Sequence, residues 1–389
     1  MKEAIRVNLK EIAKTLGIES YPEFLEQAVP VAICDEERIR ALQEEFDFFG
    51  DFYEEVLQEV KALAEDPVRR AWGEAVAGYA LHTTIRDVKT TPFPLPQGEV
   101  GMLPLLIHLP MVPSAIENYR SRGFSEEVLH KLMHSYKGCM QGVYNQLGKR
   151  GLDQRYYRWL FHYSKALIFP HYGFLVEVAS FHDRAVILKN REDGTLMPLL
   201  RQETLHRSGL VLGAAGCEDP EGARTVEFRE TEDGFYGYPV IDGKPADAEE
   251  FFPKETWCYG MQPGDIALSV HLPKAMDISP ANVDEAFGSV VEIARKWYPE
   301  YDVRGLYCGS WLLDPSLADI LGPESKIVQY GNRFVRYPAM SAGREVFSFV
   351  FPPNITDLNE LPENTRLERG LKKLYLSGGY IHAFYGVIL

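Results

Sequence analysis

The sequence has no excess of positive charge. Its 41 lysines and arginines are outnumbered by 56 aspartates and glutamates, which gives a formal net charge of −15. Such a surface repels nucleic acids and anionic membranes, because neutralisation of phosphate is the main source of non-specific affinity for DNA. We therefore expect neither nucleic acid nor membrane among the partners.

Cysteine is scarce, and long apolar runs are missing. The five cysteines are scattered and never form a C-x-x-C pair, which favours reduced thiols over a disulfide framework or a zinc ribbon. No apolar run approaches the ~18 residues of a membrane span, since the longest, residues 101–112, is broken by Pro104 and Pro110. The N-terminus also lacks the apolar segment of a signal peptide. These features predict a soluble, cytoplasmic protein.

Two catalytic signatures are incomplete. A serine nucleophile elbow needs G-x-S-x-G, but Cys308 and Leu312 stand where the glycines around Ser310 should be. His130 and His134 have the spacing of the H-E-x-x-H metalloprotease motif, but a lysine follows His130. We therefore predict neither a serine hydrolase nor a metal site.

The 389 residues divide into two parts by pattern. Up to about residue 165, apolar residues recur at helical spacing behind the N-cap signals Asp35, Asp66 and Ser125. Beyond that point, short β-rich runs dominate. The pattern predicts an α+β fold, with a helical N-terminal domain over residues 1–152 and a mixed α/β sheet domain over residues 153–389.

The clearest unit of the second part is strand, helix, strand. Residues 266–272 alternate between apolar and polar, Ser279-Pro280 begins a helix, and residues 303–311 form a second strand. With a helical crossover the two strands should be parallel. The carboxyl ends of such strands form the ligand crevices of open α/β sheets, so we expect a crevice there, with His271 on its first wall.

Three further predictions rest on weaker signals. Residues 174–181 and 185–188 lie close together and are expected to pair as a hairpin. A second hairpin is expected from residues 327–337 with residues 345–351. Residues 242–263 are rich in proline, glycine and acidic side chains, which indicates a surface connection.

The second strand of the crevice runs into a recognisable motif. Residues 310–315 read SWLLDP, which is similar to a signature of bacterial acyltransferase-domain proteins with a helical N-acyltransferase N-terminal domain and a GNAT-like C-terminal domain. Other segments resemble motifs of the same family: VHLP at 270–273, SKIV at 325–328 followed by Arg333-Phe334, and DLNELP at 357–362. The resemblance is strong over residues 265–389 and loose over residues 110–180.

The resemblance implies a GNAT-like C-terminal fold and transfer of an acyl group to a small-molecule amine. It also implies acyl-CoA or acetyl-CoA as co-substrate. The usual GNAT loop holds the pyrophosphate on backbone N–H groups at a helix N-terminus, but here residues 273–280 contain no glycine. This departure leaves a second hypothesis open, a degenerate GNAT fold that binds a small ligand or a partner without catalysis.

Three residues are candidates for catalysis. His271 is the candidate base for the amine, since imidazole titrates near neutral pH. Ser310 is expected to orient the substrate or to bind the carbonyl oxygen, and the resemblance implies Tyr307 as an acid for the leaving thiolate. The alternatives are a histidine bonded to backbone and a serine that satisfies its own strand end. Cys308 is either the nucleophile of a thioester hydrolase or a buried, inert thiol.

Four residues are candidates for contacts with coenzyme A. Lys274 and Ser279 precede the helix, whose N-terminus carries partial positive charge. Arg333 can pair with phosphate through its guanidinium, or it belongs to a solvated strand face. Trp311 either lines the pantetheine slot or packs in the core. Asp314 most simply caps the helix that follows it.

Overall fold

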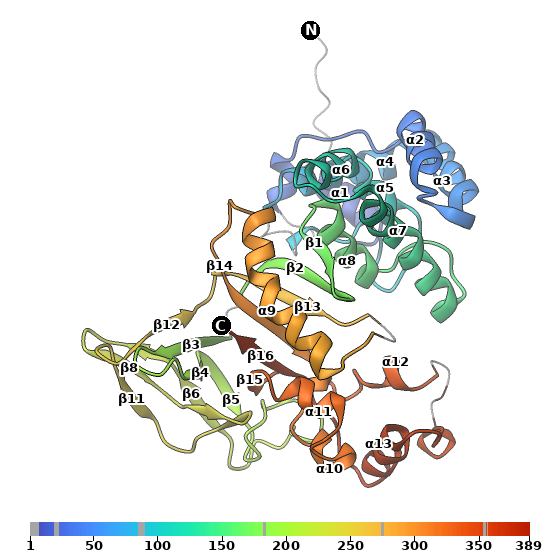
Figure 1. Cartoon of the computed structure of the whole chain (residues 1–389). Helices are drawn as coiled ribbons and strands as arrows, with labels where there is room; N and C mark the ends of the chain where they lie inside the picture. Colours follow the sequence, from blue (N-terminus) through green and yellow to red (C-terminus); the bar gives the residue numbers. More distant parts are fainter. Residues whose placement is uncertain are drawn as a thin grey trace. The chain divides into compact units, whose positions relative to one another are not determined.

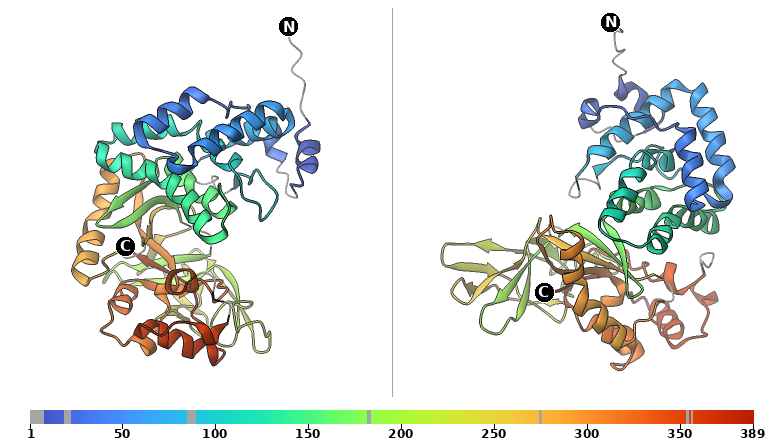
Figure 2. Two further views of the ribbon diagram at one scale, coloured as in Figure 1. Left: turned by 90° about the vertical axis from the view of Figure 1, so that its right-hand side faces the viewer. Right: turned by 45° about the horizontal axis from the view of Figure 1, so that its top comes forward.

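The structure is a computed structural model that describes residues 8–18, 23–84, 90–181, 184–273, 276–352, 355 and 357–389. The chain divides into two compact units, Met1–Phe169 and Pro170–Leu389. The first is built of helices and the second combines strands with helices (Figures 1 and 2). The predicted α+β class is therefore confirmed.

Local capping signals define the helices of the first unit. Asp35, Asp66 and Ser125 each accept a hydrogen bond from the backbone N–H three residues on, as expected of N-caps. The elements are α1 (Leu9–Thr15), η1 (Glu23–Gln27), α2 (Glu36–Phe46), η2 (Gly50–Phe52), α3 (Tyr53–Glu65), α4 (Pro67–His82), α5 (Leu103–His108), α6 (Val112–Ser121), α7 (Glu126–Leu147) and α8 (Gln154–Ser164).

The last helix of the first unit lies beyond the expected domain boundary at 152/153. In α8, Tyr157 and Leu160 are buried, and the Tyr157 carbonyl lies 3.0 Å from His108 Nε2 on α5. These contacts join α8 to the helices before it, so the compact units divide after Phe169.

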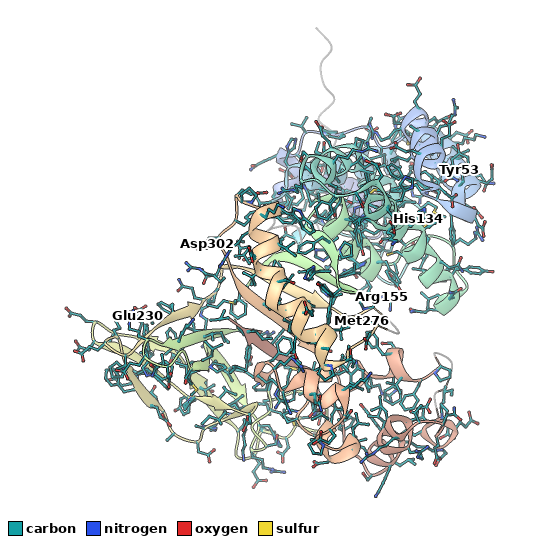
Figure 3. All side chains as sticks on the ribbon, viewed as in Figure 1. Tyr53, His134, Arg155, Glu230, Met276 and Asp302 are labelled. Atoms are coloured by element: carbon teal, nitrogen blue, oxygen red, sulfur yellow. The ribbon has the colours of Figure 1, made fainter. Side chains whose placement is uncertain are left out.

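A six-stranded sheet forms the centre of the second unit. Its order is β1-β2-β13-β14-β16-β15. The strands are β1 (Ile168–His171), β2 (Phe174–Ser180), β13 (Ile266–His271), β14 (Val303–Ser310), β15 (Val335–Pro338) and β16 (Phe384–Ile388). β13 and β14 are parallel, as predicted, and α9 (Pro280–Trp297) connects them. Figure 3 labels Met276 near the N-terminal end of α9 and Asp302 near its opposite end.

The two faces of this sheet are covered differently. The helix α9 packs against β14 and buries Val283, Ala286, Val290 and Ala294, one stripe of a 3.6-residue period. On the other face, a buried cluster joins Tyr307 to strands of several small sheets. The small sheets are built from β3 (Ala185–Asn190), β4 (Leu196–Leu200), β5 (Gln202–Leu205), β6 (Arg224–Glu227), β7 (Arg229–Glu230), β8 (Gly234–Gly237), β9 (Val240–Ile241), β10 (Lys244–Pro245), β11 (Glu250–Pro253) and β12 (Trp257–Met261).

Short helices complete the unit. They are η4 (Trp311–Leu313), α10 (Leu317–Leu321), α11 (Lys326–Gly331), α12 (Phe347–Val350), η5 (Leu358–Glu360) and α13 (Arg366–Leu376). α13 begins with a capping box in which Thr365 and Glu368 bond each other's backbone N–H groups, which satisfies two helix-end donors.

The two hairpin predictions were wrong, and the segment predicted as a surface connection contains strands. β2 pairs with β13 and β3 pairs with β4 and β12, so residues 174–181 and 185–188 belong to different sheets. Residues 327–337 begin as α11, because buried packing of Val328 and Tyr330 overrides their β propensity. Residues 242–263 contain β10, β11 and β12, and Pro245, Pro253 and Gly260 lie within these short strands.

Candidate active site

The two parallel strands separate at their carboxyl ends. The last pair between β13 and β14 is Ser269 with Tyr307. Beyond it, β13 stays paired with β2 through His271, and β14 stays paired with β16 through Ser310. The ladder between β13 and β14 therefore ends before either strand does, and these unpaired facing edges, called the opening below, lie at the position where a crevice is expected.

A row of polar side chains crosses the sheet beside this opening. Glu177 of β2 pairs with Ser269, and Ser269 pairs with Tyr307, so the three side chains share one face. The Ser269 side chain is hydrogen-bonded to the Tyr307 hydroxyl. His271 follows Ser269 by two residues on the same face, and its Nε2 lies 3.0 Å from Oε2 of Glu177.

The histidine reaches the surface and the glutamate does not. The side chain of His271 is 33% exposed, whereas that of Glu177 is 8% exposed. Sequence reasoning predicted His271 and missed Glu177. The available signal was a single charged residue inside the otherwise apolar run of residues 174–179, because buried charges are rare unless they are paired.

Tyr307 is held as a neutral phenol. It is 7% exposed, and its ring packs edge-on to Phe181 with centroids 5.9 Å apart. Burial, followed by the nearby Glu177 carboxylate, raises the pKa of Tyr307 well above its usual value. The hydroxyl therefore remains a proton donor at neutral pH.

Ser310 is not brought together with His271. Strand alternation turns it to the sheet face opposite that of Tyr307. Its Oγ accepts a hydrogen bond from the Leu312 backbone N–H at 3.1 Å, so Ser310 acts as the N-cap of η4. This geometry corresponds to the alternative in which the serine satisfies its own strand end.

The rest of the SWLLDP motif lies in the core. Trp311 is 7% exposed in a cluster with α10, α11 and α13. Asp314 Oδ1 accepts from the Ser316 backbone N–H at 2.8 Å, and Oδ2 accepts from that of His382 at 2.6 Å. Cys308 is fully buried, and burial raises its thiol pKa to about 11, which disfavours a nucleophilic thiolate.

The N-terminus of α9 carries its own carboxylate. Ser279 is the N-cap but does not cap with its side chain, because its hydroxyl donates to Asp277 Oδ2 at 2.8 Å and its N–H to Oδ1 at 2.9 Å. These bonds lower the pKa of Asp277. The other candidate at this loop, Lys274, lies outside the described residues.

Arg333 connects α11 to the first turn of α9. Its Nε lies 2.8 Å from Oδ1 of Asp284, its Nη1 donates to the Gln329 carbonyl at 2.7 Å, and its Nη2 donates to the Pro280 carbonyl at 3.4 Å. The guanidinium is thus next to the helix N-terminus, but it is engaged with protein acceptors rather than placed on a solvated strand face.

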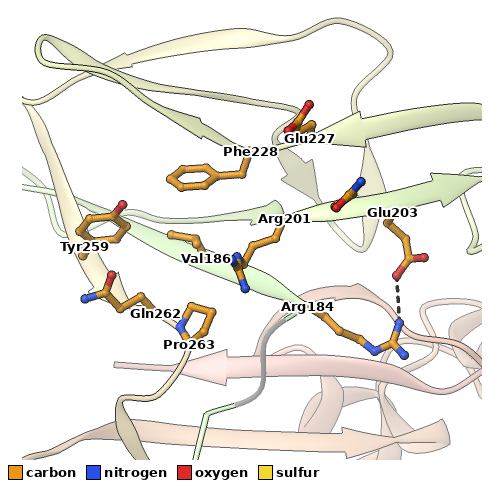
Figure 4. Close-up of a pocket in the computed structure, with 10 residues that line it drawn as sticks. Arg184, Val186, Arg201, Glu203, Glu227, Phe228, Tyr259, Gln262 and Pro263 are labelled. Carbon is orange, nitrogen blue, oxygen red and sulfur yellow. Dashed lines mark hydrogen bonds and ion pairs between the residues drawn. The ribbon is translucent and has the colours of Figure 1, made fainter.

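A separate hollow of about 640 Å³ lies among the small sheets (Figure 4). Val186, in its lining, packs in the cluster of β3, β4 and β8, not in the cluster that contains Tyr307. Two arginines and two glutamates balance in charge, and Arg184 is paired with Glu203 at 3.0 Å. This hollow therefore offers no net positive charge to the phosphates of coenzyme A.

Two kinds of feature are absent from the described residues. No group of three or more His, Cys, Asp or Glu side chains is placed there to hold a metal ion. None of the described helices combines the length and apolarity that crossing a membrane requires.

Family models match both parts of the chain. Residues 37–165 match the N-acyltransferase N-terminal domain, and residues 232–388 match the GNAT-like C-terminal domain. The chain therefore belongs to the acyltransferases that combine these two domains and is a transferase enzyme, which confirms the resemblance seen in the sequence.

Solved acyltransferase structures share the fold along the whole chain. One, in complex with decanoyl-CoA and teicoplanin, is 17% identical with a TM-score of 0.61. A second, with CoA and 10C-teicoplanin, is 16% identical with a TM-score of 0.61. A third, a mutant in complex with octanoyl-CoA, is 15% identical with a TM-score of 0.60. Each alignment covers 98% of this chain and 98% of the other. No curated protein sequence matches this chain.

Proposed function

We propose that this enzyme transfers an acyl group from acyl-CoA to an amine of a small-molecule acceptor. The observation that carries the proposal is the early end of the ladder between β13 and β14, with a partly exposed imidazole beside it. Solved structures of the same fold contain octanoyl-CoA, decanoyl-CoA or CoA, which supports acyl-CoA as the donor. Two of them also contain teicoplanin or 10C-teicoplanin, so teicoplanin should be among the acceptors that are tested.

In this mechanism the thioester carbonyl lies in the opening. His271 takes a proton from the amine as its nitrogen forms a bond to the carbonyl carbon. Backbone N–H groups at the unpaired strand ends stabilise the oxyanion. The C–S bond then breaks, Tyr307 supplies a proton to the departing thiolate, and the imidazolium proton restores the phenol. The products are the amide and coenzyme A as a free thiol.

Coenzyme A is proposed to bind along the start of α9. The first turn of that helix presents N–H groups and partial positive charge to phosphate. Ser279 begins this turn, Arg333 holds it in place, and Lys274 precedes it in sequence. Trp311 supports the η4 wall of the opening by packing. Ser310 keeps its capping role, and we assign it no chemical step.

The test combines ligand binding with release of the coenzyme A thiol. Acyl-CoAs from acetyl to decanoyl should raise the melting temperature, by a stabilisation of about 2.7 kcal/mol at a hundredfold excess over Kd. Free thiol should then appear only when an acceptor amine is present. A melting temperature unchanged by millimolar acyl-CoA would contradict the proposal, and thiol release without acceptor would favour a thioester hydrolase.

The histidine provides the decisive variant. His271→Asn should lower kcat by about 10²- to 10⁴-fold, the usual contribution of a general base, with an unchanged Kd for acyl-CoA. The control is His382→Asn, because the His382 ring nitrogens face the Ala215 carbonyl and Asp314. Full turnover by His271→Asn would remove the proposed base.

A further inference from the structure

The carboxylate of Glu177 is placed where a charge is costly. It lies on β2, between β1 and β13, and the residue is 6% exposed. Its sequence neighbours Val176 and Val178 are also buried. Moving a carboxylate out of water costs several kcal/mol unless hydrogen bonds compensate. A glutamate at this position therefore requires donors that hold its charge in place.

His271 is such a donor. Its Nε2 lies 3.0 Å from Oε2 of Glu177. An ionised carboxylate only accepts hydrogen bonds, so Nε2 carries a proton, and in the neutral imidazole Nδ1 then keeps its lone pair. The glutamate is the buried end of this pair and the histidine is the exposed end. When the imidazole is neutral, its unprotonated nitrogen therefore belongs to the more exposed of the two side chains.

We propose that Glu177 is a positioning residue that fixes His271 as the Nε2–H tautomer, so that Nδ1 accepts the proton of the acceptor amine. The proposal rests on the proposed function and adds to it the choice of nitrogen. When Nδ1 takes the proton, an imidazolium forms beside the carboxylate, and opposite charges at hydrogen-bond distance favour that state. The carboxylate itself is not protonated during the step.

A second histidine–carboxylate pair in the same unit has a different geometry. His382 Nε2 lies 2.9 Å from the Ala215 carbonyl, and its Nδ1 lies 3.9 Å from Asp314 Oδ2. Its side chain is 12% exposed. Both His382 ring nitrogens face these atoms, whereas His271 Nε2 faces the Glu177 carboxylate and the His271 side chain is 33% exposed. A base must be accessible to the acceptor amine, and His271 is the more exposed of the two histidines.

The tautomer can be measured without any substrate. Protein labelled with ¹⁵N-histidine gives ring-nitrogen signals, and the His271 signals are those missing from His271→Asn. We expect the Nε2–H pattern in the wild type and its loss in Glu177→Gln, whose amide can donate to Nε2. An Nδ1–H pattern in the wild type overturns the proposal even if Glu177→Gln does not fold.

Kinetics test the consequence for transfer. Glu177→Gln should lower kcat by about 10- to 100-fold, less than loss of the base itself, and leave the Kd of acyl-CoA unchanged. Glu177→Asp keeps the charge and should recover part of kcat. The control is Glu203→Gln, a strand carboxylate paired with Arg184 outside the opening, which should turn over normally.

The outcomes separate the two proposals. A protein with the Nε2–H tautomer set by Glu177 but without transferase activity contradicts the proposed function alone. An active enzyme whose kcat is indifferent to Glu177→Gln contradicts the positioning role alone. A loss of acyl-CoA binding in Glu177→Gln with kcat preserved also overturns that role, because it would show a structural effect on the donor site.

Discussion

At the scale of single residues, Asp277 sets the charge that a phosphate meets at α9. Its carboxylate is bound to the N–H and hydroxyl of Ser279. Asp277→Asn keeps an oxygen for the same turn and removes the negative charge. We expect acyl-CoA to bind about two- to fivefold tighter, from the 0.3–1 kcal/mol typical of a charge at a helix N-terminus. Isothermal titration calorimetry at low salt measures the change.

The Asp277 prediction has two internal checks. The gain in affinity for acyl-CoA should be smaller at high ionic strength, since salt screens exposed charges. Asp319→Asn, an exposed carboxylate in the first turn of α10, should leave the affinity unchanged. Equal or weaker binding by Asp277→Asn would mean that the phosphates bind elsewhere.

His108 makes the helical unit sensitive to acid. Burial lowers its pKa from 6.5 to about 3. Below pH 6.5 the His108 imidazole becomes protonated in the unfolded chain but stays neutral in the folded chain. The free energy of unfolding therefore falls as the pH drops from 6.5 toward 3. The loss is about 2 kcal/mol by pH 5, at 1.36 kcal/mol for each pH unit.

Urea denaturation at several pH values, followed on the helical signal, measures this loss. His108→Gln, although less stable at pH 7 because it loses bonds to Ser164 and the Tyr157 carbonyl, should show a flatter pH dependence between 6.5 and 5. An unchanged slope in the variant would assign the acid sensitivity to other groups.

The site residues differ in how far the sequence reveals them. Alternation along residues 266–272 identified His271, because it depends only on local pattern. Glu177 depends on which strand lies beside β13, and no local pattern encodes that pairing. Ser310 was assigned to the crevice by its place at a strand end, but its side chain lies on the opposite face. Sequence reasoning therefore locates the opening more reliably than it assigns each side chain to a face of the sheet.

At the scale of elements, helices were predictable where a cap is local. Asp35, Asp66 and Ser125 each bond a backbone N–H only three residues away, so the signal and its structural effect lie within one turn. The strand partners predicted for residues 174–181 and 327–337 were wrong, because pairing there joins segments far apart in the chain. Tertiary packing, rather than propensity, decides such segments.

Two helical glycines should respond in opposite ways to alanine. A Cβ at Gly370 in α13 would lie 2.2 Å from Ile320 Cγ2 of α10, so Gly370→Ala should destabilise by about 1–3 kcal/mol, as overpacking does. Gly288 in α9 has open space, so Gly288→Ala should stabilise by about 1 kcal/mol. Chemical denaturation measures both, and a stabilised Gly370→Ala would show that α10 and α13 are not closely packed.

At the scale of the whole molecule, the two compact units predict where the chain can be divided. A fragment of residues 1–169 retains α8, whose Ser164 hydroxyl bonds His108 Nδ1 and the Tyr136 hydroxyl. A fragment of residues 1–152 loses those contacts and exposes apolar surface. We expect cooperative unfolding of the longer fragment only, seen by calorimetry, whereas equal cooperativity would support the boundary at 152/153.

The buried Glu177 has a consequence for how this enzyme would respond to laboratory evolution. A buried ionic pair often adds nothing to stability compared with apolar residues of similar size, so selection for heat resistance alone would tolerate or even favour apolar replacements of both Glu177 and His271. Such selection would yield a more stable protein that lacks the proposed base. Thermostabilised descendants of this acyltransferase should therefore be screened for turnover in every round.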